Sequence, residues 1–242
     1  FWRSFTHWIG GMGVFVFILA ILPMIGGSTM YLMKAESPGP SVDKFVPRVK
    51  DTAKILYTLY IGITLLQIVC LLLAGMPLFD TLTHTFGTVG TGGFGIKNSS
   101  IGGYTSLQQN IITFFMIASG VNYSAYFYII SKNFKDAFKM EEVRWYFGII
   151  LASVFIITLN TWHLYTGFGE TVKHSFFQVA SIITTTGYST TDFDLWPELS
   201  KTILVLLMVI GACAGSTGGG FKVSRILILM KTIKKELSLM LH

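Results

Sequence analysis

Charged residues are scarce in this sequence of 242 residues: only 12% are Asp, Glu, Lys or Arg, whereas ordinary soluble domains contain about 25%. Hydrophobic residues make up 52% of the chain, and the mean hydropathy is +0.61. A chain so poor in charge and so rich in apolar side chains is not typical of a soluble enzyme or binding domain. The composition therefore predicts a membrane protein.

Cysteine is scarce, with two residues in the chain, and metal-ligand and nucleotide-binding motifs are lacking. Cys70 and Cys213 both lie in apolar stretches, which predicts buried, inert thiols rather than a disulfide framework. The histidines show no metal-ligand spacing such as HExxH, and the stretch GSTGGGFK lacks the GxxxxGK spacing of a phosphate-binding loop. Because no cluster of acids, bases or metal ligands lies in the apolar stretches, we expect no enzyme activity, no cofactor and no transition metal.

The chain does contain several apolar stretches that can each cross about 30 Å of hydrocarbon as a helix of about 20 residues. These stretches are residues 8–33, 53–75, 107–130, 143–165 and 202–230. The last one is interrupted by the sequence GACAGSTGGGFK at residues 211–222. The sequence thus predicts an all-α polytopic membrane protein with a broken helix near its end.

Lys and Arg are concentrated in alternate connections, and short cytoplasmic loops are enriched in these residues. Connections 34–54 and 131–144 are rich in basic residues and are predicted to lie inside, as is the basic stretch from residue 222 onwards. Connections 76–106 and 162–201 are poor in Lys and Arg and are predicted to lie outside. The net charge of +6 is therefore mostly a topology signal and gives no support to nucleic-acid binding.

Each outside connection has a short helix-like run, at 78–89 and 170–183, followed by a Gly/Thr-rich segment. The sequence TFGTVGTGGFG aligns with VASIITTTGYS, so that Thr91 and Gly93 correspond to Thr185 and Gly187. One copy would also fit an external turn with Gly and Thr as turn residues. Two copies, both outside and both after a helix too short to span, favour a re-entrant pore loop that occurs twice.

Irregular backbone at membrane depth is tolerated only where protein or water surrounds it, and its carbonyls can replace the hydration shell of a cation. Glycine permits the backbone conformations that such a strand needs, and hard neutral oxygens suit an alkali cation. The expected ion-binding residues are Thr91, Gly92, Gly93, Thr185, Thr186 and Gly187. Further filter candidates are Gly90, Phe94, Thr184 and Tyr188.

Two electrostatic features should favour a cation at these segments. The C-terminal ends of the two short helices, which are the negative ends of the helix dipoles, should point towards the ion path. Four acids in the second outside connection should raise the local cation concentration: Glu170, Asp192, Asp194 and Glu198.

Four stretches of the chain resemble the Trk/Ktr/HKT potassium transporter superfamily, in particular its TrkH-type membrane subunits. They are TTTGYSTTDF, TVGTGGFG, RSFTHWIGGMGVFVFILAILP and GACAGSTGGGFKVSRILILMK. The resemblance covers essentially the whole chain and implies four span–pore loop–span repeats around one K⁺-channel-like pore. It implies that residues 1–52 are the closing helix of repeat one with a cytoplasmic linker, 53–141 are repeat two, and 142–242 are repeat three and the start of a further linker. The rest of repeat one would precede Phe1 and repeat four would follow His242.

The resemblance further implies potassium uptake through a pore in the plasma membrane, the bacterial inner membrane, with K⁺ as the transported ion. It implies a homodimer that rests on a cytosolic nucleotide-binding ring of the TrkA/KtrA type. The alternative function is an alternating-access secondary transporter, a K⁺/H⁺ or K⁺/Na⁺ symporter whose broken helices bind ions near the midplane. Entry of both pore loops from the same, outer side favours the channel-like pore.

The break in the last apolar stretch is interpreted as a gate. Each glycine costs a helix about 1 kcal/mol relative to alanine, and the backbone groups freed by the break need polar partners. The resemblance implies that this loop is an intramembrane barrier that moves when the cytosolic partner changes state, whereas a static kink needed for packing is the alternative. The expected gate residues are Gly215, Ser216, Thr217, Gly218, Gly219, Gly220 and Lys222.

Overall fold

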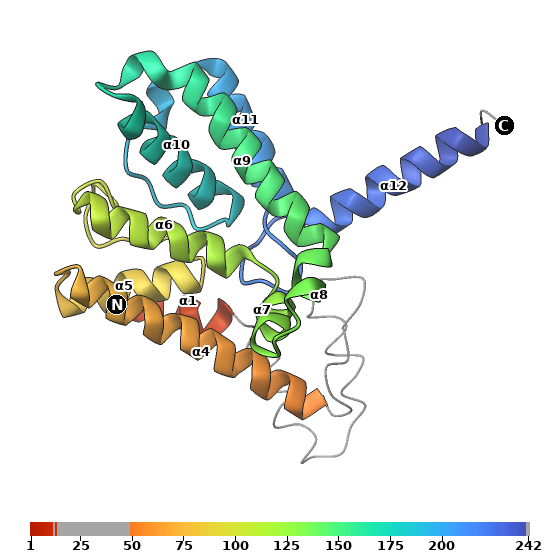
Figure 1. The fold of residues 1–242 in the computed structure, drawn as a ribbon. Coiled ribbons are helices and arrows are strands. Elements are labelled where there is room, and N and C mark those ends of the chain that lie inside the picture. The colour runs from red at the N-terminus through yellow and green to blue at the C-terminus, as the bar shows by residue number, and fades with distance from the viewer. Residues whose placement is uncertain (12, 14–48, 241–242) are drawn as a thin grey trace.

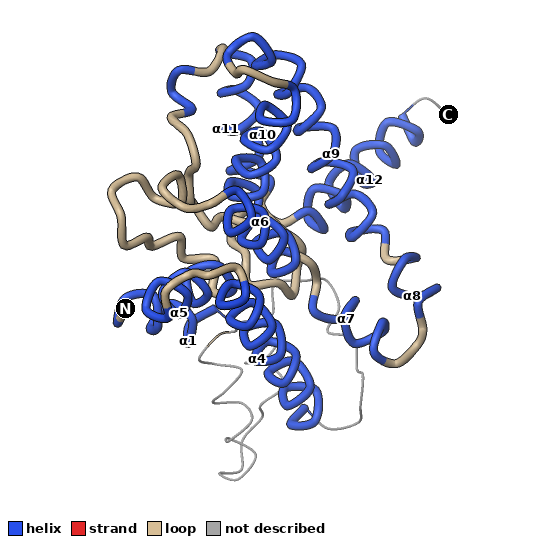
Figure 2. Tube along the Cα trace, turned by 60° about the vertical axis from the view of Figure 1, so that its left-hand side comes forward, coloured by secondary structure: helices blue, strands red, loops and turns tan. Residues whose placement is uncertain are grey.

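The computed structural model describes residues 1–11, 13 and 49–240, and within these ranges the chain forms helices joined by loops, without strands (Figures 1 and 2). The apolar stretch expected at residues 8–33 lies mostly outside the described residues. The α-helices are α1 (Trp2–Gly11), α4 (Val49–Leu73), α5 (Leu78–Val89), α6 (Ser106–Gly120), α7 (Tyr123–Ile130), α8 (Phe134–Lys139), α9 (Glu141–Thr161), α10 (Phe168–Ile183), α11 (Glu198–Ile210) and α12 (Val223–Met240). Two 3₁₀ turns, η2 (Trp162–Leu164) and η3 (Phe193–Leu195), complete them.

Helices α4 and α9 are the two described helical stretches that are long and apolar enough to cross a membrane unbroken, over Lys54–Leu73 and Glu141–Leu164. They coincide with the apolar stretches expected at 53–75 and 143–165. Both helices expose large apolar side chains, such as Leu66 on α4 and Phe155 on α9. Extended apolar surface of this kind marks contact with a membrane or with another protein segment.

The short helices α5 and α10 lie in the interior, where α5 packs against α1, α4 and α6, and α10 packs against α6, α9 and α11. Helix α5 spans the residues expected from the sequence, and α10 begins two residues earlier than expected. The buried side chains of α5 are mostly polar: Thr81, Thr83, His84, Thr85 and Thr88. Buried threonines and a buried histidine on one short helix are unusual in a protein interior, where apolar side chains predominate.

The stretch 107–130 is not one helix, so the prediction of a continuous span there is wrong. Helix α6 ends at Gly120, and the side chain of Asn122 caps the new helix α7. The Cys213 amide donates to the Gly120 carbonyl at 3.1 Å, and the Tyr123 amide donates to the Gly215 carbonyl at 3.0 Å. The break is stable because a distant loop supplies the backbone hydrogen bonds that an unbroken helix would make internally.

The stretch 202–230 is divided into α11 and α12 by residues 211–222, hereafter the central loop. The amides of Phe221 and Lys222 donate to the carbonyls of Val209 and Ile210 at 3.0 and 2.9 Å, so both ends of the loop meet at the end of α11. Gly211 and Gly220 have φ values of +72° and +81°, which favour glycine at these reversals. The loop turns into the centre of the molecule, whereas α12 projects away from the other helices (Figure 1).

Candidate ion-binding site

Two short segments that directly follow α5 and α10 share one unusual backbone; residues 90–94 are segment A and residues 184–188 are segment B. Thr91 and Thr185 have φ values of +54° and +58°, and Gly93 and Gly187 have values of +67° and +86°. A β-branched residue with positive φ is a genuine outlier. Its occurrence at equivalent positions of both segments shows that the two Gly/Thr sequences adopt the same local structure.

The hydrogen bonds of the two segments also correspond. The amides of Gly92 and Gly93 both donate to the Gly87 carbonyl, at 2.7 and 3.1 Å. In segment B, Thr186 and Gly187 donate in the same way to Ser181, at 2.9 and 3.2 Å. Each segment is therefore fastened by its amides to the C-terminal end of its own short helix, which is the negative end of the helix dipole.

The two segments lie side by side. A Cβ atom placed on Gly93 would overlap the carbonyl oxygen of Thr186, so this glycine is required by close approach as well as by its positive φ. Gly187 has no atom of the described residues within 4 Å of the position of such a Cβ. The structure thus brings the expected ion-binding residues of both segments into one place.

Segment A differs from segment B at Gly92, where segment B has Thr186. A Cβ on Gly92 would lie 2.5 Å from the ring of His7 in α1. Thr186 has room for its side chain, and its hydroxyl lies 2.8 Å from the hydroxyl of Thr184. The sequence shows that the two segments differ but not why, because His7 approaches from a distant part of the chain.

The central loop touches both segments through the two threonines of positive φ. The Thr91 hydroxyl donates to the Thr217 carbonyl at 2.9 Å, and the Gly219 amide donates to the Thr185 hydroxyl at 2.7 Å. A Cβ on Gly218 would lie 3.1 Å from the Thr184 carbonyl oxygen. The structure therefore places the expected gate residues directly against the expected filter residues.

The other expected gate residues hold the central loop in its folded shape. The Ser216 hydroxyl donates to the Cys213 carbonyl at 2.6 Å, and the Thr217 hydroxyl donates to the Ser119 carbonyl at 3.1 Å. Lys222 is only 5% exposed, and its ammonium group donates to the Gly218 carbonyl. Lys222 thus turns into the loop, where its positive charge lies one residue from the loop atoms that contact segment B.

Glu142, near the start of α9, is a residue that sequence reasoning missed. Its carboxylate oxygen Oε1 accepts hydrogen bonds from the amides of Ala214 and Ser224, at 2.6 and 3.2 Å. Its other oxygen lies 3.5 Å from the Asn122 side-chain nitrogen. Glu142 therefore connects Ala214 of the central loop to Ser224 in the first turn of α12 and to the break between α6 and α7. The available sequence signal was a carboxylate at the entrance of an apolar helix.

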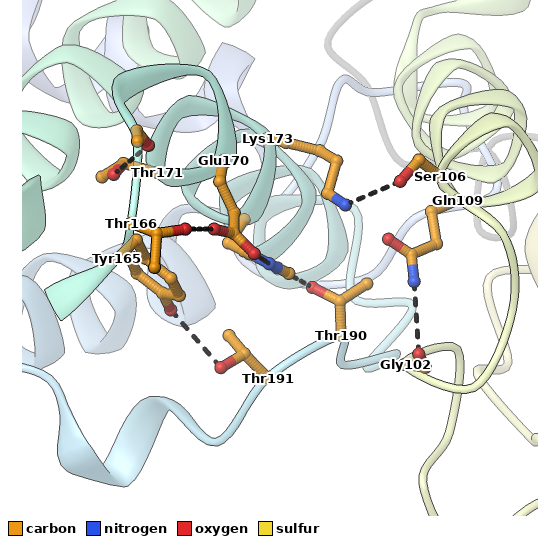
Figure 3. Close-up of polar contacts among 12 residues, drawn as sticks. Gly102, Ser106, Gln109, Tyr165, Thr166, Glu170, Thr171, Lys173, Thr190 and Thr191 are labelled. Atoms are coloured by element: carbon orange, nitrogen blue, oxygen red, sulfur yellow. Dashed lines mark hydrogen bonds and ion pairs between the residues drawn. The ribbon is translucent and has the colours of Figure 1, made fainter.

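A cleft of about 510 Å³ lies next to segment B and is formed by both outside connections. The Ile101 amide of the first connection donates to the Ser189 carbonyl of the second at 3.0 Å. Figure 3 shows a further hydrogen bond between the two halves, in which the Lys173 ammonium group of α10 donates to the Ser106 hydroxyl at the start of α6. The cleft is lined by Asn98, Ser99, Gly102, Ser189, Thr190, Thr191, Asp192, Phe193 and Asp194.

The four acids predicted to attract cations have different surroundings. Asp192 and Asp194 line the cleft, whereas Glu198 pairs with Lys201 at 2.7 Å. The hydrogen bond from the Thr166 hydroxyl lowers the pKa of the Glu170 carboxyl, assisted by His174. Burial lowers the pKa of His174, whose ring nitrogen Nδ1 lies 2.9 Å from the Thr190 hydroxyl. Of the four acids only the two aspartates thus line the cleft, and the Lys201 ammonium group, which pairs with Glu198, also donates to the Asp194 carbonyl oxygen at 3.4 Å.

Comparison with known proteins identifies the family. The model of the TrkH family, described as cation transport protein, matches residues 1–240. The chain belongs to the TrkH family. This membership confirms the resemblance to TrkH-type membrane subunits that the sequence shows.

Several TrkH-family relatives match the whole chain. The Trk system potassium uptake protein TrkH of Salmonella typhimurium is 40% identical over 247 residues, which are 100% of this chain and 51% of the relative. TrkG of Escherichia coli is 36% identical with the same coverage. The crystal structure of the potassium transporter TrkH from Vibrio parahaemolyticus superimposes with a TM-score of 0.83 at 33% identity, covering 100% of this chain and 50% of that structure. The chain thus spans about half the length of these relatives.

Proposed function

We propose that this chain provides two filter strands of a channel-like pathway for potassium uptake across the bacterial inner membrane. Segments A and B line one axial path, and their backbone and hydroxyl oxygens replace the hydration shell of K⁺. The ion ligands are Thr91, Gly92, Gly93, Thr185, Thr186 and Gly187. Gly90, Phe94, Thr184 and Tyr188 complete the two strands. Relatives of twice the length are named potassium uptake proteins, which supports this choice of ion.

One observation carries the proposal: two segments far apart in sequence have the same left-handed Thr and Gly positions and meet side by side at the ends of two buried helices. Their amides are bonded to Gly87 and Ser181. The carbonyl oxygens of the six proposed ligands accept no hydrogen bond from the described residues. Neutral oxygens held in this way suit an alkali cation.

The repeat organisation expected from sequence is part of the proposal. Residues 53–141 and 142–242 are then the second and third span–pore loop–span repeats, and residues 1–52 hold the closing helix of the first repeat and a linker. Each described repeat has a long helix, a short buried helix and a left-handed segment in the same order. A complete pathway of four strands takes its other two strands from the part of the relatives' length that this chain does not span.

The central loop is the proposed gate. It contacts Thr91 and Thr185 at the same time, and Lys222 adds a positive charge to this obstruction. Opening then requires the loop to leave both segments. By resemblance, a homodimer of membrane subunits rests on a cytosolic nucleotide-binding ring of the TrkA/KtrA type, and a change of state in this ring moves the loop. The basic helix α12, which projects from the other helices, is placed to receive that signal.

The test of the filter is a serine substitution at Gly93 in the complete gene product that contains this chain, expressed in a bacterium without its own potassium uptake systems. Gly93→Ser places a Cβ on the Thr186 carbonyl, so uptake of Rb⁺ or its ratio to Na⁺ uptake should collapse. At Gly187 a serine would be strained by the φ of +86°, but its Cβ would meet open space. Gly187→Ser should therefore reduce uptake or selectivity less than Gly93→Ser does.

The matched control is Gly148→Ser in α9, where a Cβ meets no described atom within 4 Å. This variant should transport like the parent. If both filter variants reach the membrane in normal amounts and keep the parental Rb⁺ to Na⁺ ratio, segments A and B do not form the filter.

A further inference from the structure

The side chain of Tyr188, the last residue of segment B, is completely buried and reaches the helix that carries segment A. Its hydroxyl lies 3.4 Å from the His84 ring nitrogen Nδ1 and 3.4 Å from the His84 carbonyl oxygen. A Cβ on Gly87 would overlap this hydroxyl, so α5 has its glycine where the tyrosine arrives. Tyr188 thus joins two pore-loop units that are far apart in the sequence.

His84 is in turn held by groups of its own unit. Its Nε2 lies 2.9 Å from the Tyr104 hydroxyl, which donates its proton to the Asp80 carboxylate at 2.8 Å. Since the Tyr104 proton is used there, His84 must donate from Nε2. Its unprotonated Nδ1 and its carbonyl oxygen then both face the one hydroxyl proton of Tyr188. The Lys97 ammonium lies 4.1 Å from the centre of the Tyr104 ring. Tyr188, His84, Tyr104 and Asp80 are therefore joined by consecutive polar contacts.

The connection acts on the geometry between the two segments. Segment A is fastened to α5 through the Gly87 carbonyl, which accepts the amides of Gly92 and Gly93. Tyr188 fastens segment B to the same turn of α5, because its hydroxyl contacts His84 and packs against Gly87. The distance between the oxygens of the two segments is consequently fixed by one helix.

We propose that His84 and Tyr188 are positioning residues that set the spacing of segments A and B and thereby the preference for K⁺ over Na⁺. This inference rests on the proposed function, because it assigns these residues to the filter described there. Phe94, the equivalent of Tyr188 in segment A, has no hydroxyl and lies under the Arg3 guanidinium at 3.6 Å instead. The polar contact from a filter aromatic residue to the neighbouring short helix is therefore made by segment B to α5, and Phe94 of segment A has no hydroxyl with which to make the equivalent contact.

The experiment measures Rb⁺ and Na⁺ uptake by Tyr188→Phe, His84→Leu and the double variant in the complete gene product. Tyr188→Phe keeps the ring and removes the hydroxyl, so discrimination should fall about fivefold, the factor that one net hydrogen bond represents. The double variant should lose no more than the larger single loss, because both substitutions remove the same contact. Tyr165→Phe is the control, since its hydroxyl binds Trp196 and Thr191 outside the two segments.

Two results overturn the inference. In the first, the parent prefers K⁺ over Na⁺ and Tyr188→Phe keeps the parental ratio of Rb⁺ to Na⁺ uptake. Tyr188→Phe is used here because it is the variant least disruptive to folding. The second is a double variant whose loss equals the product of the two single losses, which would show independent effects. A different result would overturn the proposed function itself: a parent without a preference for K⁺, or a preference that Gly93→Ser leaves unchanged. The inference would then fail because segments A and B are not the filter, and not because of Tyr188 or His84.

Discussion

The amide of Gly219 in the central loop donates a 2.7 Å hydrogen bond to the hydroxyl of Thr185 in segment B. On the other side, the hydroxyl of Thr91 in segment A donates to the Thr217 carbonyl. Both threonines have positive φ, a conformation that costs about 1–3 kcal/mol and persists only where surrounding contacts enforce it. The central loop supplies such contacts, so its movement changes the surroundings of both segments together.

Replacing Glu142 by glutamine should raise basal cation flux. The carboxylate ties the central loop to the start of α12 through the Ala214 and Ser224 amides, and hydrogen bonds to a charged acceptor contribute about 1.5–3 kcal/mol each. Glutamine keeps the size but weakens these bonds, so the loop should leave the segments more often. Rb⁺ uptake without stimulation of the transporter, at equal protein in the membrane, measures the effect and should rise about tenfold.

Glu198→Gln is the control, because Glu198 pairs with Lys201 at the start of α11, away from the central loop. Deletion of residues 214–219 removes most of the proposed gate and should raise basal flux further. If the deletion variant is well expressed, correctly assembled and no more permeable than the parent, the central loop is not the gate.

Neutralising Asp192 and Asp194 together, as Asn, should reduce uptake at low ionic strength by on the order of threefold. Both aspartates line the cleft next to segment B and, on the proposed function, should raise the local concentration of cations there. Salt screens this attraction over about 8–10 Å, so the reduction should vanish at high ionic strength. Glu198→Gln is the control, since Lys201 already balances its charge. An equal loss at low and high salt would indicate a structural role for the aspartates.

Acid should destabilise the outer end of α10 through His174. Burial holds the pKa of His174 below its usual value of about 6.5, so the unfolded chain takes up this proton before the folded protein does. Its contribution to stability is complete above about pH 6.5 and is lost as the pH falls below that value. The groups facing the ring are Glu170 at 3.9 Å, Thr190 and Tyr165, whose ring stacks on it at 5.0 Å, with Lys173 nearby.

The measurement is the thermal unfolding temperature in detergent at pH 7.5 and pH 5.5. The unfolding temperature of the parent should fall between pH 7.5 and pH 5.5, and that of His174→Gln should fall by a smaller amount. His163→Gln, at an exposed position of η2, should behave like the parent. An unchanged slope in His174→Gln would contradict a role of this ring in the pH dependence.

The short helices and the two segments could be predicted from the sequence because their signals are local. Helix α5 spans the expected residues, and the alignment of Thr91 with Thr185 and of Gly93 with Gly187 corresponds to matching φ values. Both features follow from a few neighbouring residues. Glycine and threonine placement therefore carried most of the information on the candidate site.

Contacts between distant parts of the chain could not be predicted. The break before Tyr123 depends on backbone partners at Cys213 and Gly215, and an apolar sequence alone favours an unbroken helix. The absence of a side chain at Gly92 is explained by His7 of α1. Glu142 looked like an ordinary acid at a helix entrance, whereas its partners lie in the central loop. Such residues acquire their roles only when the helices pack.

The most direct test of a channel-like potassium pathway is the reversal potential of the current carried by the complete gene product in a planar bilayer. The account predicts a current that reverses at the K⁺ equilibrium potential, follows the K⁺ gradient when it is changed, and grows without saturating at high driving force. Gly93→Ser should abolish this current or shift its reversal towards that of Na⁺. A reversal potential that instead follows the H⁺ or Na⁺ gradient at constant K⁺ would contradict the account and identify a symporter.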